Sequence, residues 1–412
     1  MKAALAALGL ALGAAGGLGA QATTDPRVAE ALRILERDNR WTLEQQRSIC
    51  EIPAPPFKEA ARAAEYARRF EALGYRATID QIGNVIAVRK GTGGGRRLVL
   101  AAHLDTVFPE GTDVRVRREG TRMAGPGIGD DCRGLAVVLA VARAMQVARV
   151  ETAGDVVFVG NVGEEGPGNL RGIRHLFETQ PAGKIEAFIS VDGIGLGVVS
   201  RGVGSNRYRV TFKGPGGHSY GDFGIPNPMH AMGRAIAMIA DLQVPAQPRT
   251  IFNVGVVEGG TSVNSIAGTA TMQVDLRSES APALAAVDSA FHRLVSAAVD
   301  RERARWPTSQ APLAAEIQVI GRRAAGSQPD SAWIVRAALE TATGLGIPTP
   351  TPGSASTDAN VPLGLGIPSL ALDGGGRGNG AHSLGEWYDD GDQGYLGPQW
   401  ALLLAVRVTA GK

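Results

Sequence analysis

Residues 98–135 constrain the fold more than any other part of this 412-residue chain. The segment opens with the apolar run LVLAA, which is typical of a parallel strand buried on both faces. His103 and Asp105 follow this run, and residues two apart on a strand point to the same side. In open α/β sheets, ligands bind beyond the carboxyl ends of the strands, so this pair marks a candidate site.

A glycine-rich loop then delivers two adjacent carboxylates, Asp130 and Asp131, directly before an apolar helix predicted over residues 134–147. Two buried acids at the start of a helix are costly unless a helix cap or a cation accepts them, so the loop indicates a metal ion. The GPGIG run in this loop also resembles a dinucleotide-binding fingerprint. It follows a charged segment and its glycine spacing is wrong, which argues against NAD binding.

The first 22 residues have the organisation of a cleaved signal peptide. Lys2 supplies a positive charge, an Ala/Leu run follows, and Ala20-Gln21-Ala22 is an A-x-A cleavage site. The run is too short and too rich in glycine to span a bilayer, and a buried N-terminal helix is the alternative. We therefore expect an exported protein, periplasmic or secreted, without a membrane segment.

Composition narrows the class of protein further. A chain of this length predicts two domains. The net charge is only +2 and no basic block stands out, so nucleic-acid binding has no electrostatic footprint. Cys50 and Cys132 are too few for a disulfide scaffold, and pairing in an oxidising compartment and free buried thiols both stay open.

Apolar strands alternate with helices through the first half, which is typical of an α/β fold with a mostly parallel sheet flanked by helices. The pattern changes at residues 207–320, where half-exposed strands and a long helix indicate an inserted α+β lid domain. We expect the catalytic domain to comprise residues 23–206 and 321–412, with residues 321–330 as the return linker.

Acidic and imidazole side chains gather where the predicted strands end. Any one alone would be a turn residue or a cap, but together they would repel, and no lysine compensates them. Two divalent cations remove this repulsion, and the donor types suit Zn²⁺, with Co²⁺ or Mn²⁺ as substitutes. The set comprises His103, Asp105, Asp130, Asp131, Glu164, Glu165, Asp192 and His382.

Six motifs in order carry a resemblance that covers nearly the whole mature chain. They are HLDTV (103–107), GPGIGDDCRG (125–134), GEEG (163–166), SVDG (190–193), GGHS (216–219) and GAHS (380–383). The chain resembles the dinuclear-zinc exopeptidase and deacylase family, which includes peptidase T, the bacterial glutamate carboxypeptidase, acetylornithine deacetylase and succinyl-diaminopimelate desuccinylase.

The resemblance implies a role for each metal ligand. His103 and Asp192 would bind one zinc ion, Glu165 and His382 the other, and Asp130 would bridge the two. In this family a cis peptide bond precedes the residue at position 131. Two zinc ions would share a bridging hydroxide as well as the carboxylate.

The resemblance also implies catalytic roles. Asp105 would hydrogen-bond His103, and Glu164 would be the general base. His218 matches a histidine that stabilises the oxyanion, often from a partner subunit, which implies a homodimer through the inserted domain. The alternative for His218 is an ordinary loop histidine.

Substrate contacts are implied at two positions. Asn264 and Arg277 match residues that contact substrate, and Arg277 would hold a carboxylate, or else be a surface charge at a strand end. Residues 356–358 lie in a loop that we expect to line the pocket. Asp192, where other members carry Glu, resembles the aminopeptidases such as peptidase T more than the carboxypeptidases and deacylases.

The sequence thus predicts an exported dinuclear-zinc metallopeptidase that hydrolyses peptide bonds of short peptides, as an aminopeptidase or a di- or tripeptidase. A carboxypeptidase or an N-acyl-amino-acid deacylase is the alternative within the family. A non-catalytic binding protein is the alternative of another class, but such a protein usually loses a ligand or the base, and here every position is filled.

Overall fold

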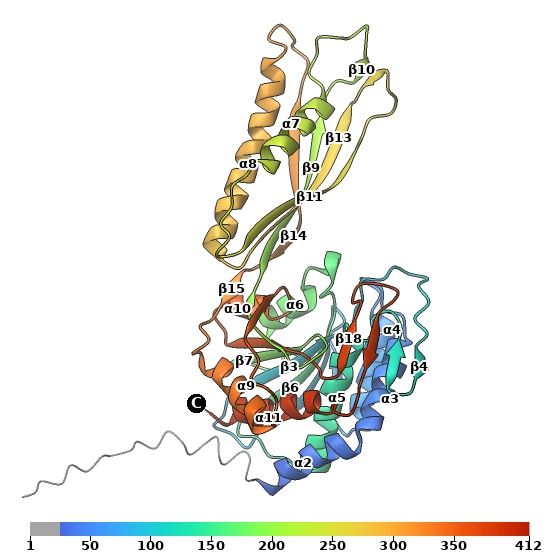
Figure 1. Cartoon of the computed structure of the whole chain (residues 1–412), viewed down its shortest axis with the longest axis vertical. Coiled ribbons are helices and arrows are strands. Elements are labelled where there is room, and N and C mark those ends of the chain that lie inside the picture. The colour runs from blue at the N-terminus through green and yellow to red at the C-terminus, as the bar shows by residue number, and fades with distance from the viewer. Residues whose placement is uncertain (1–24, 412) are drawn as a thin grey trace, which may run out of the picture.

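The computed structural model describes residues 25–411, so the predicted signal peptide, residues 1–22, lies outside the described residues. The chain forms two bodies stacked along the long axis, a larger α/β body and an elongated second body, here called the lid (Figure 1). Within residues 25–411, none of the helices combines the length and the apolar character that crossing a membrane requires.

The larger body is built on a nine-stranded sheet. The neighbours β6, β3, β7 and β17 are parallel, whereas the strands outside them pair antiparallel, apart from β16 with β8. The prediction of a mostly parallel sheet is confirmed for the centre. In order the strands are β1 (Ala77–Ile79), β2 (Val85–Arg89), β6 (Val156–Asn161), β3 (Leu98–His103), β7 (Ala187–Val191), β17 (Ser369–Leu372), β8 (Val198–Gly202) and β15 (Gly326–Ser327), with β16 (Gly353–Ala355) also beside β8.

Helices cover both faces of this sheet because successive residues of its central strands are apolar, so that both faces are apolar. Leu98 and Leu100 belong to the core on one face, and Val99 and Ala101 belong to the core on the other. The first face carries α2 (Pro26–Arg37), α4 (Ala60–Ala72), α5 (Cys132–Val147), α9 (Trp333–Gly344) and α11 (Leu396–Ala410), with α3 (Asn39–Cys50) against α5. The second carries α6 (Arg171–Thr179) and α10 (Asn360–Gly364).

The lid has its own antiparallel sheet and its own core. Tyr208, Met272 and Phe291 are fully buried between this sheet and two helices. The strands, in order, are β11 (Thr250–Gly259), β13 (Thr269–Ser278), β9 (Gly204–Lys213) and β14 (Ala314–Arg323), and the helices are α7 (Pro228–Ala240) and α8 (Ala281–Ala304). β14 includes the first three residues of the predicted linker, since a β-bulge after Val319 hides the alternation.

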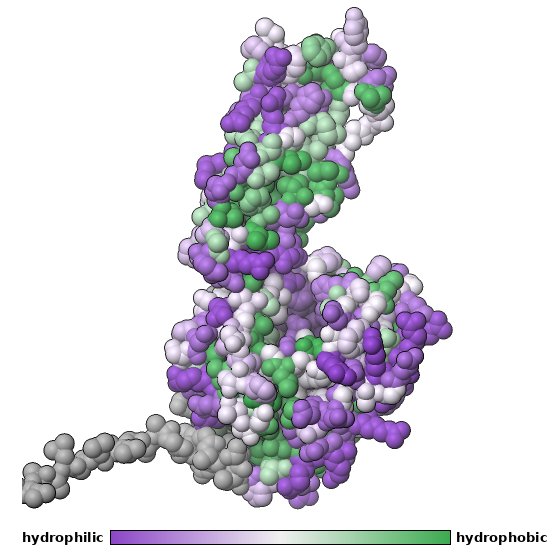
Figure 2. All heavy atoms as spheres, in the orientation of Figure 1, coloured by the Kyte–Doolittle hydropathy of each residue, from purple (hydrophilic) through white to green (hydrophobic). Residues whose placement is uncertain are grey.

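Two smaller sheets matter for the site. β10 (Gly217–His218) and β12 (Ser265–Ile266) pair at the end of the lid that is far from the larger body (Figure 1). Beside the central sheet, β18 (Arg377–Asn379), β19 (Trp387–Asp389), β5 (Arg122–Ala124) and β4 (Arg117–Glu119) form a sheet that brings distant segments together. Figure 2 shows a notch between the lid and the larger body on one side.

Candidate metal centre

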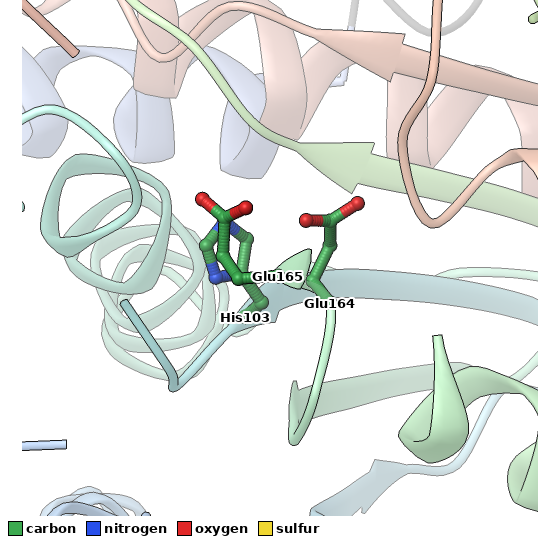
Figure 3. Close-up of side chains that lie close together, drawn as sticks. All are labelled: His103, Glu164 and Glu165. Atoms are coloured by element: carbon green, nitrogen blue, oxygen red, sulfur yellow. The ribbon is translucent and has the colours of Figure 1, made fainter. Parts of the chain in front are cut away.

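The central strands deliver polar side chains to one edge of the larger sheet. β3 ends on His103, β6 leads to Glu164 and Glu165, and β7 leads to Asp192. Because β6, β3 and β7 are neighbours, these residues converge although they are far apart in sequence. Figure 3 shows His103, Glu164 and Glu165 gathered at this point.

The carboxylate of Asp130 lies between two imidazoles. Its Oδ1 is 3.0 Å from Nε2 of His103, and its Oδ2 is 3.0 Å from Nε2 of His382. His382 Nε2 is also 2.8 Å from Oε1 of Glu165. One carboxylate that faces two ring nitrogens fits a bridging ligand between two cations.

The donor atoms divide into groups that fit two metal ions. His103, Asp130 and Asp192 place one donor atom each within 4.8 Å of one another, and so do Asp130, Glu165 and His382. The two groups share Asp130, which is the division that the resemblance implies. Imidazole and carboxylate donors suit Zn²⁺ and its neighbours, so the residues present fit such ions, and their role as ligands stays a prediction. The Asp130–Asp131 peptide bond is cis.

Electrostatics within this cluster are strongly perturbed. Hydrogen bonds to Asp130 and Glu165 raise the pKa of His382 to about 10. Burial raises the pKa of Asp192 to about 7, helped by the nearby charge of Asp130 and opposed by His103. Burial acts to lower the pKa of His103, but its bonds to neighbouring carboxylates outweigh burial and raise it. Perturbed ionisable groups in one concave cluster are typical of a functional site.

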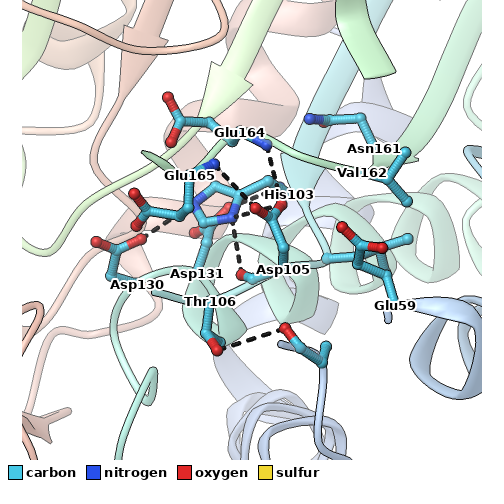
Figure 4. Close-up of polar contacts among 12 residues, drawn as sticks. Glu59, His103, Asp105, Thr106, Asp130, Asp131, Asn161, Val162, Glu164 and Glu165 are labelled. Atoms are coloured by element: carbon cyan, nitrogen blue, oxygen red, sulfur yellow. Dashed lines mark hydrogen bonds and ion pairs between the residues drawn. The ribbon is translucent and has the colours of Figure 1, made fainter. Parts of the chain in front are cut away.

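Asp105 is fully buried beneath His103 (Figure 4). Its carboxylate accepts backbone N–H bonds from Glu164 at 3.0 Å and Glu165 at 2.8 Å. Nδ1 of His103 lies 3.0 Å from the Asp105 carbonyl oxygen and 3.6 Å from its carboxylate. Asp105 therefore keeps Nδ1 protonated chiefly through its carbonyl, and it leaves Nε2 facing Asp130.

Glu164 has a partner that the sequence did not reveal. Nη1 of Arg323, the last residue of β14, lies 2.8 Å from Oε1 of Glu164, and both side chains are buried. Burial raises the pKa of Glu164, and Arg323 opposes this effect. From the sequence, only lysine was considered as a compensating cation, whereas here an arginine from the predicted linker reaches the site.

Two further acids lie close to the site, of which Glu386 was missed and Asp358 was predicted only as part of a pocket-lining loop. Glu386 accepts three backbone N–H bonds around Asp130, and burial raises its pKa to about 7. It stands four residues after His382, so its closeness to the GAHS motif could have indicated it. Asp358, in the loop predicted to line the pocket, accepts a bond from Asn161 at 2.7 Å, and burial raises its pKa to about 6.

The structure does not bring the predicted lid residues to this cluster within one chain. His218 lies on β10 at the far end of the lid (Figure 1), and the backbone N–H of Ser219 bonds to the carbonyl of Asn264. Nδ1 of His218 accepts N–H bonds from Tyr220 and Gly221, both at 3.2 Å. The neutral ring therefore carries its proton on Nε2, which can donate to an oxyanion.

Arg277 lies near the other end of β13, close to the junction of the two bodies. It pairs in register with Ser205 of β9, and Ser205 also pairs with Arg323. Arg207 lies one row away on the same face, where burial and the charge of Arg323 lower its pKa. Asp275 bonds to Arg277 at 2.7 Å. Nε of Arg207 lies 3.5 Å from the same carboxylate, so two arginines share Asp275 and leave this part of the sheet positively charged.

Cys50 and Cys132 are both free and fully buried. Cys132 begins α5, directly after Asp131, which caps this helix by accepting a bond from the N–H of Gly134 at 3.0 Å. The sequence left open whether the two cysteines pair, and in this structure both are free thiols.

Comparisons with known proteins show what the chain resembles in sequence and in fold. Residues 99–396 match the profile of peptidase family M20/M25/M40. Among curated proteins, a LysW-lysine/LysW-ornithine hydrolase of Pyrococcus abyssi is 37% identical over 120 residues, which are 29% of this chain and 32% of the relative. The chain thus matches about a third of that relative's length.

Solved structures share the fold over nearly their whole length. The aminopeptidase PepT of Bacillus cereus has a TM-score of 0.73 at 19% identity, and the match covers 89% of this chain and 98% of that one. A dinuclear metal-binding peptidase of Bacillus subtilis from family M20 has a TM-score of 0.64 at 20% identity, with 90% and 98% covered.

Proposed function

The chain belongs to peptidase family M20/M25/M40, whose members are dinuclear metal-binding hydrolases of peptide or amide bonds, and we propose that it cleaves short peptides with two zinc ions. The observation that carries this proposal is the Asp130 carboxylate between Nε2 of His103 and Nε2 of His382. His103 and Asp192 would hold one ion, and Glu165 and His382 the other. When bound, two such ions polarise the scissile carbonyl and acidify a shared water.

The remaining chemistry belongs to side chains of this protein. Glu164 lies beside the ligands and is the general base, which takes a proton from the attacking water and passes it to the leaving amine. Burial raises its pKa, which makes the carboxylate a stronger base, and Arg323 holds it in place. Asp105 fixes the backbone of Glu164 and Glu165.

His218 completes the site from a second copy of the chain. Its Nε2–H is free to donate, but it lies at the far end of the lid from its own metal cluster. The outer strand β11 exposes Val256 and Val257, whose side chains are apolar. A dimer through the lids would cover this edge and carry His218 to the partner's site.

The test replaces Glu164 with Gln. Turnover should fall by about 10²- to 10⁴-fold, the usual contribution of a general base, while both metal equivalents stay bound. E178Q, at an exposed glutamate of α6, is the control and should keep full activity. Retained activity in E164Q would remove Glu164 from this role.

Substrate class separates two candidates. The short Asp192 favours peptides with a free amino terminus, so unblocked tripeptides should be cleaved in preference to N-acetylated amino acids. The positive charge of Arg207 and Arg277 favours the second candidate, a carboxypeptidase or deacylase that holds a substrate carboxylate. In that case R277M raises KM for free-acid substrates but not for amidated ones, and R301M, at an exposed residue of α8, changes neither.

We also propose that residues 1–22 direct export. The support is the charge, the apolar run and the A-x-A site in the sequence. Expression of the whole chain in a bacterium should yield a periplasmic or secreted product whose mass corresponds to a start at Thr23. Full-length protein in the cytoplasm would contradict the proposal.

A further inference from the structure

Glu386 is a fully buried carboxylate that binds the backbone of the loop leading into the proposed metal ligand Asp130. Its Oε1 accepts N–H bonds from Gly129 at 2.7 Å and from Asp130 at 2.9 Å, and its Oε2 accepts one from Gly127 at 2.8 Å. The N–H of Gly125 also bonds to the carbonyl of Glu386 at 3.0 Å. Its two oxygens thus bind backbone, which makes it a poor candidate for a metal ligand.

The glycines of the GPGIG run explain how the loop can wrap this carboxylate. Gly127 has a φ of +78°, a conformation that other residues rarely adopt. A Cβ at Gly129 would lie 2.1 Å from Cδ1 of Ile194 and 3.1 Å from Oε1 of Glu386. The run that resembled a dinucleotide fingerprint therefore encloses a carboxylate that belongs to the protein, as nests of N–H groups do for anions.

Glu386 also connects two segments that carry proposed ligands. It stands four residues after His382. The loop that it binds carries Asp130, which lies 256 residues earlier in the chain. The pairing of β19 with β5 brings these two segments together. One side chain therefore fixes the distance between the loop of the bridging ligand and the loop of His382.

We propose that Glu386 is a positioning residue, which holds Asp130 between His103 and His382 so that the site can take up two cations. This inference rests on the proposed function. A carboxylate that only stabilises the fold would lower the free energy of unfolding when it is replaced. A positioning residue also changes how tightly, and with what geometry, the metals are held. Outer partners of ligands typically contribute 10- to 100-fold in metal affinity.

The experiment compares E386Q with the wild type and with E302Q, all as whole folded chains. Gln has the same shape as Glu but turns an NH₂ group toward at least one N–H donor, so it loses at least one bond. Glu302 is an equally buried carboxylate in the lid that accepts bonds from Asn227 and Arg234, far from the site, so E302Q controls for the loss of a buried charge. Zn²⁺ affinity is measured by competition with a chromophoric chelator, and the ligand geometry by the visible spectrum of Co²⁺-loaded protein.

The wild type and E302Q should bind two equivalents with equal affinity and the same Co²⁺ spectrum. E386Q should bind at least one equivalent 10- to 100-fold more weakly and with an altered spectrum. If E386Q does not fold, E386D keeps the charge but withdraws the oxygens by one methylene, and it should show the same two changes.

The outcomes separate this inference from the proposed function. A wild-type protein that binds no second equivalent contradicts the dinuclear function itself. A wild type with two equivalents, beside a folded E386Q or E386D with unchanged affinity and spectrum, overturns only the role of Glu386.

Discussion

Arg323 and Glu164 form an ion pair across the junction between the lid and the larger body, with Nη1 2.8 Å from Oε1. The exposed fractions of the two side chains are 5% and 6%. Arg323 is the last residue of β14, so the strand that leaves the lid ends at the residue that binds the proposed general base, Glu164. Any movement of the lid about this junction acts directly on the carboxylate that we expect to transfer the proton.

Replacement of Arg323 with Met should destabilise the metal-free protein by about 3 kcal/mol, because a buried carboxylate is left without its partner. The double variant R323M/E164Q should recover part of that loss in stability, since Gln at position 164 removes the unpaired negative charge. Urea unfolding of the four proteins of this double-mutant cycle gives the coupling energy, which we expect to be about 2 kcal/mol.

R322M is the matched control for this cycle, because Arg322 is the neighbouring residue of β14 and its side chain is exposed. It should change the free energy of unfolding by less than about 0.5 kcal/mol. Additive effects of R323M and E164Q would mean that the ion pair does not form in solution.

The two parts of this pair show what the sequence could and could not predict. Glu164 stands in a motif at the end of a strongly apolar strand, so local pattern alone indicated its position. Arg323 stands beyond a β-bulge, in a stretch that reads as a linker, and only the register of β14 with β9 turns it toward the site. Periodicity predicts elements, but a register shift in one strand decides which face a residue takes.

The same contrast holds between the two bodies. The buried parallel strands and the residues at their ends follow from sequence because the strands are largely apolar and polar residues stand at or directly after their ends. The distance between His218 and His103 depends on how the lid stands on the larger body, which no local pattern specifies. Glu386 was missed because only its N–H partners show that this glutamate is buried and bonded. These partners lie 256 to 259 residues away in the sequence, so no local pattern reveals them.

Removal of metal should lower the thermal stability of the whole chain. The cluster of His103, Asp130, Glu165, Asp192 and His382 holds three carboxylates and two imidazoles in close contact. Cations that bind this arrangement and not the unfolded chain stabilise the fold. With free metal at 100 times Kd, each site adds about 2.7 kcal/mol. Calorimetry with and without a chelator should show a lower Tm without metal, and restored metal should return it.

D192N is informative for the same measurement, because it weakens one proposed site and leaves His382 and Glu165 intact. The variant should keep one tight equivalent and show about half of the metal-dependent stabilisation. A Tm that does not respond to metal in the wild type would contradict the whole assignment of ligands.

A lysine at Val257 should prevent assembly through the lid. Val257 lies on the outer strand β11, and the residue is 54% exposed. If the lids pair along this edge, a charge there is buried on assembly and disfavours it. Sedimentation should show a monomer for V257K and a dimer for the wild type.

Activity links this surface to His218. If His218 acts across the dimer, V257K and H218A should lower kcat to the same level, and the double variant should lose nothing more, because both remove one interaction. V147K, at an exposed valine of the larger body, is the matched control. A fully active monomer would rule out a role for the partner's His218.

The pH dependence of stability should reveal Asp373, a carboxyl beyond the end of β17 whose Oδ2 accepts the N–H of Gly197 at 2.8 Å. Burial raises its pKa from 3.8 to about 6, so the folded state binds the proton more tightly than the unfolded state does. Between about pH 4 and pH 6 the folded state therefore holds more protons, and the free energy of unfolding falls as the pH rises. D373N lacks the ionisation and should lose this slope, so that its stability relative to the wild type increases by up to about 3 kcal/mol from pH 4 to pH 7.

D300N, at an aspartate whose side chain is 69% exposed, should follow the wild-type curve. Parallel curves for D373N and the wild type in urea unfolding across this range would show that Asp373 ionises normally in the folded protein.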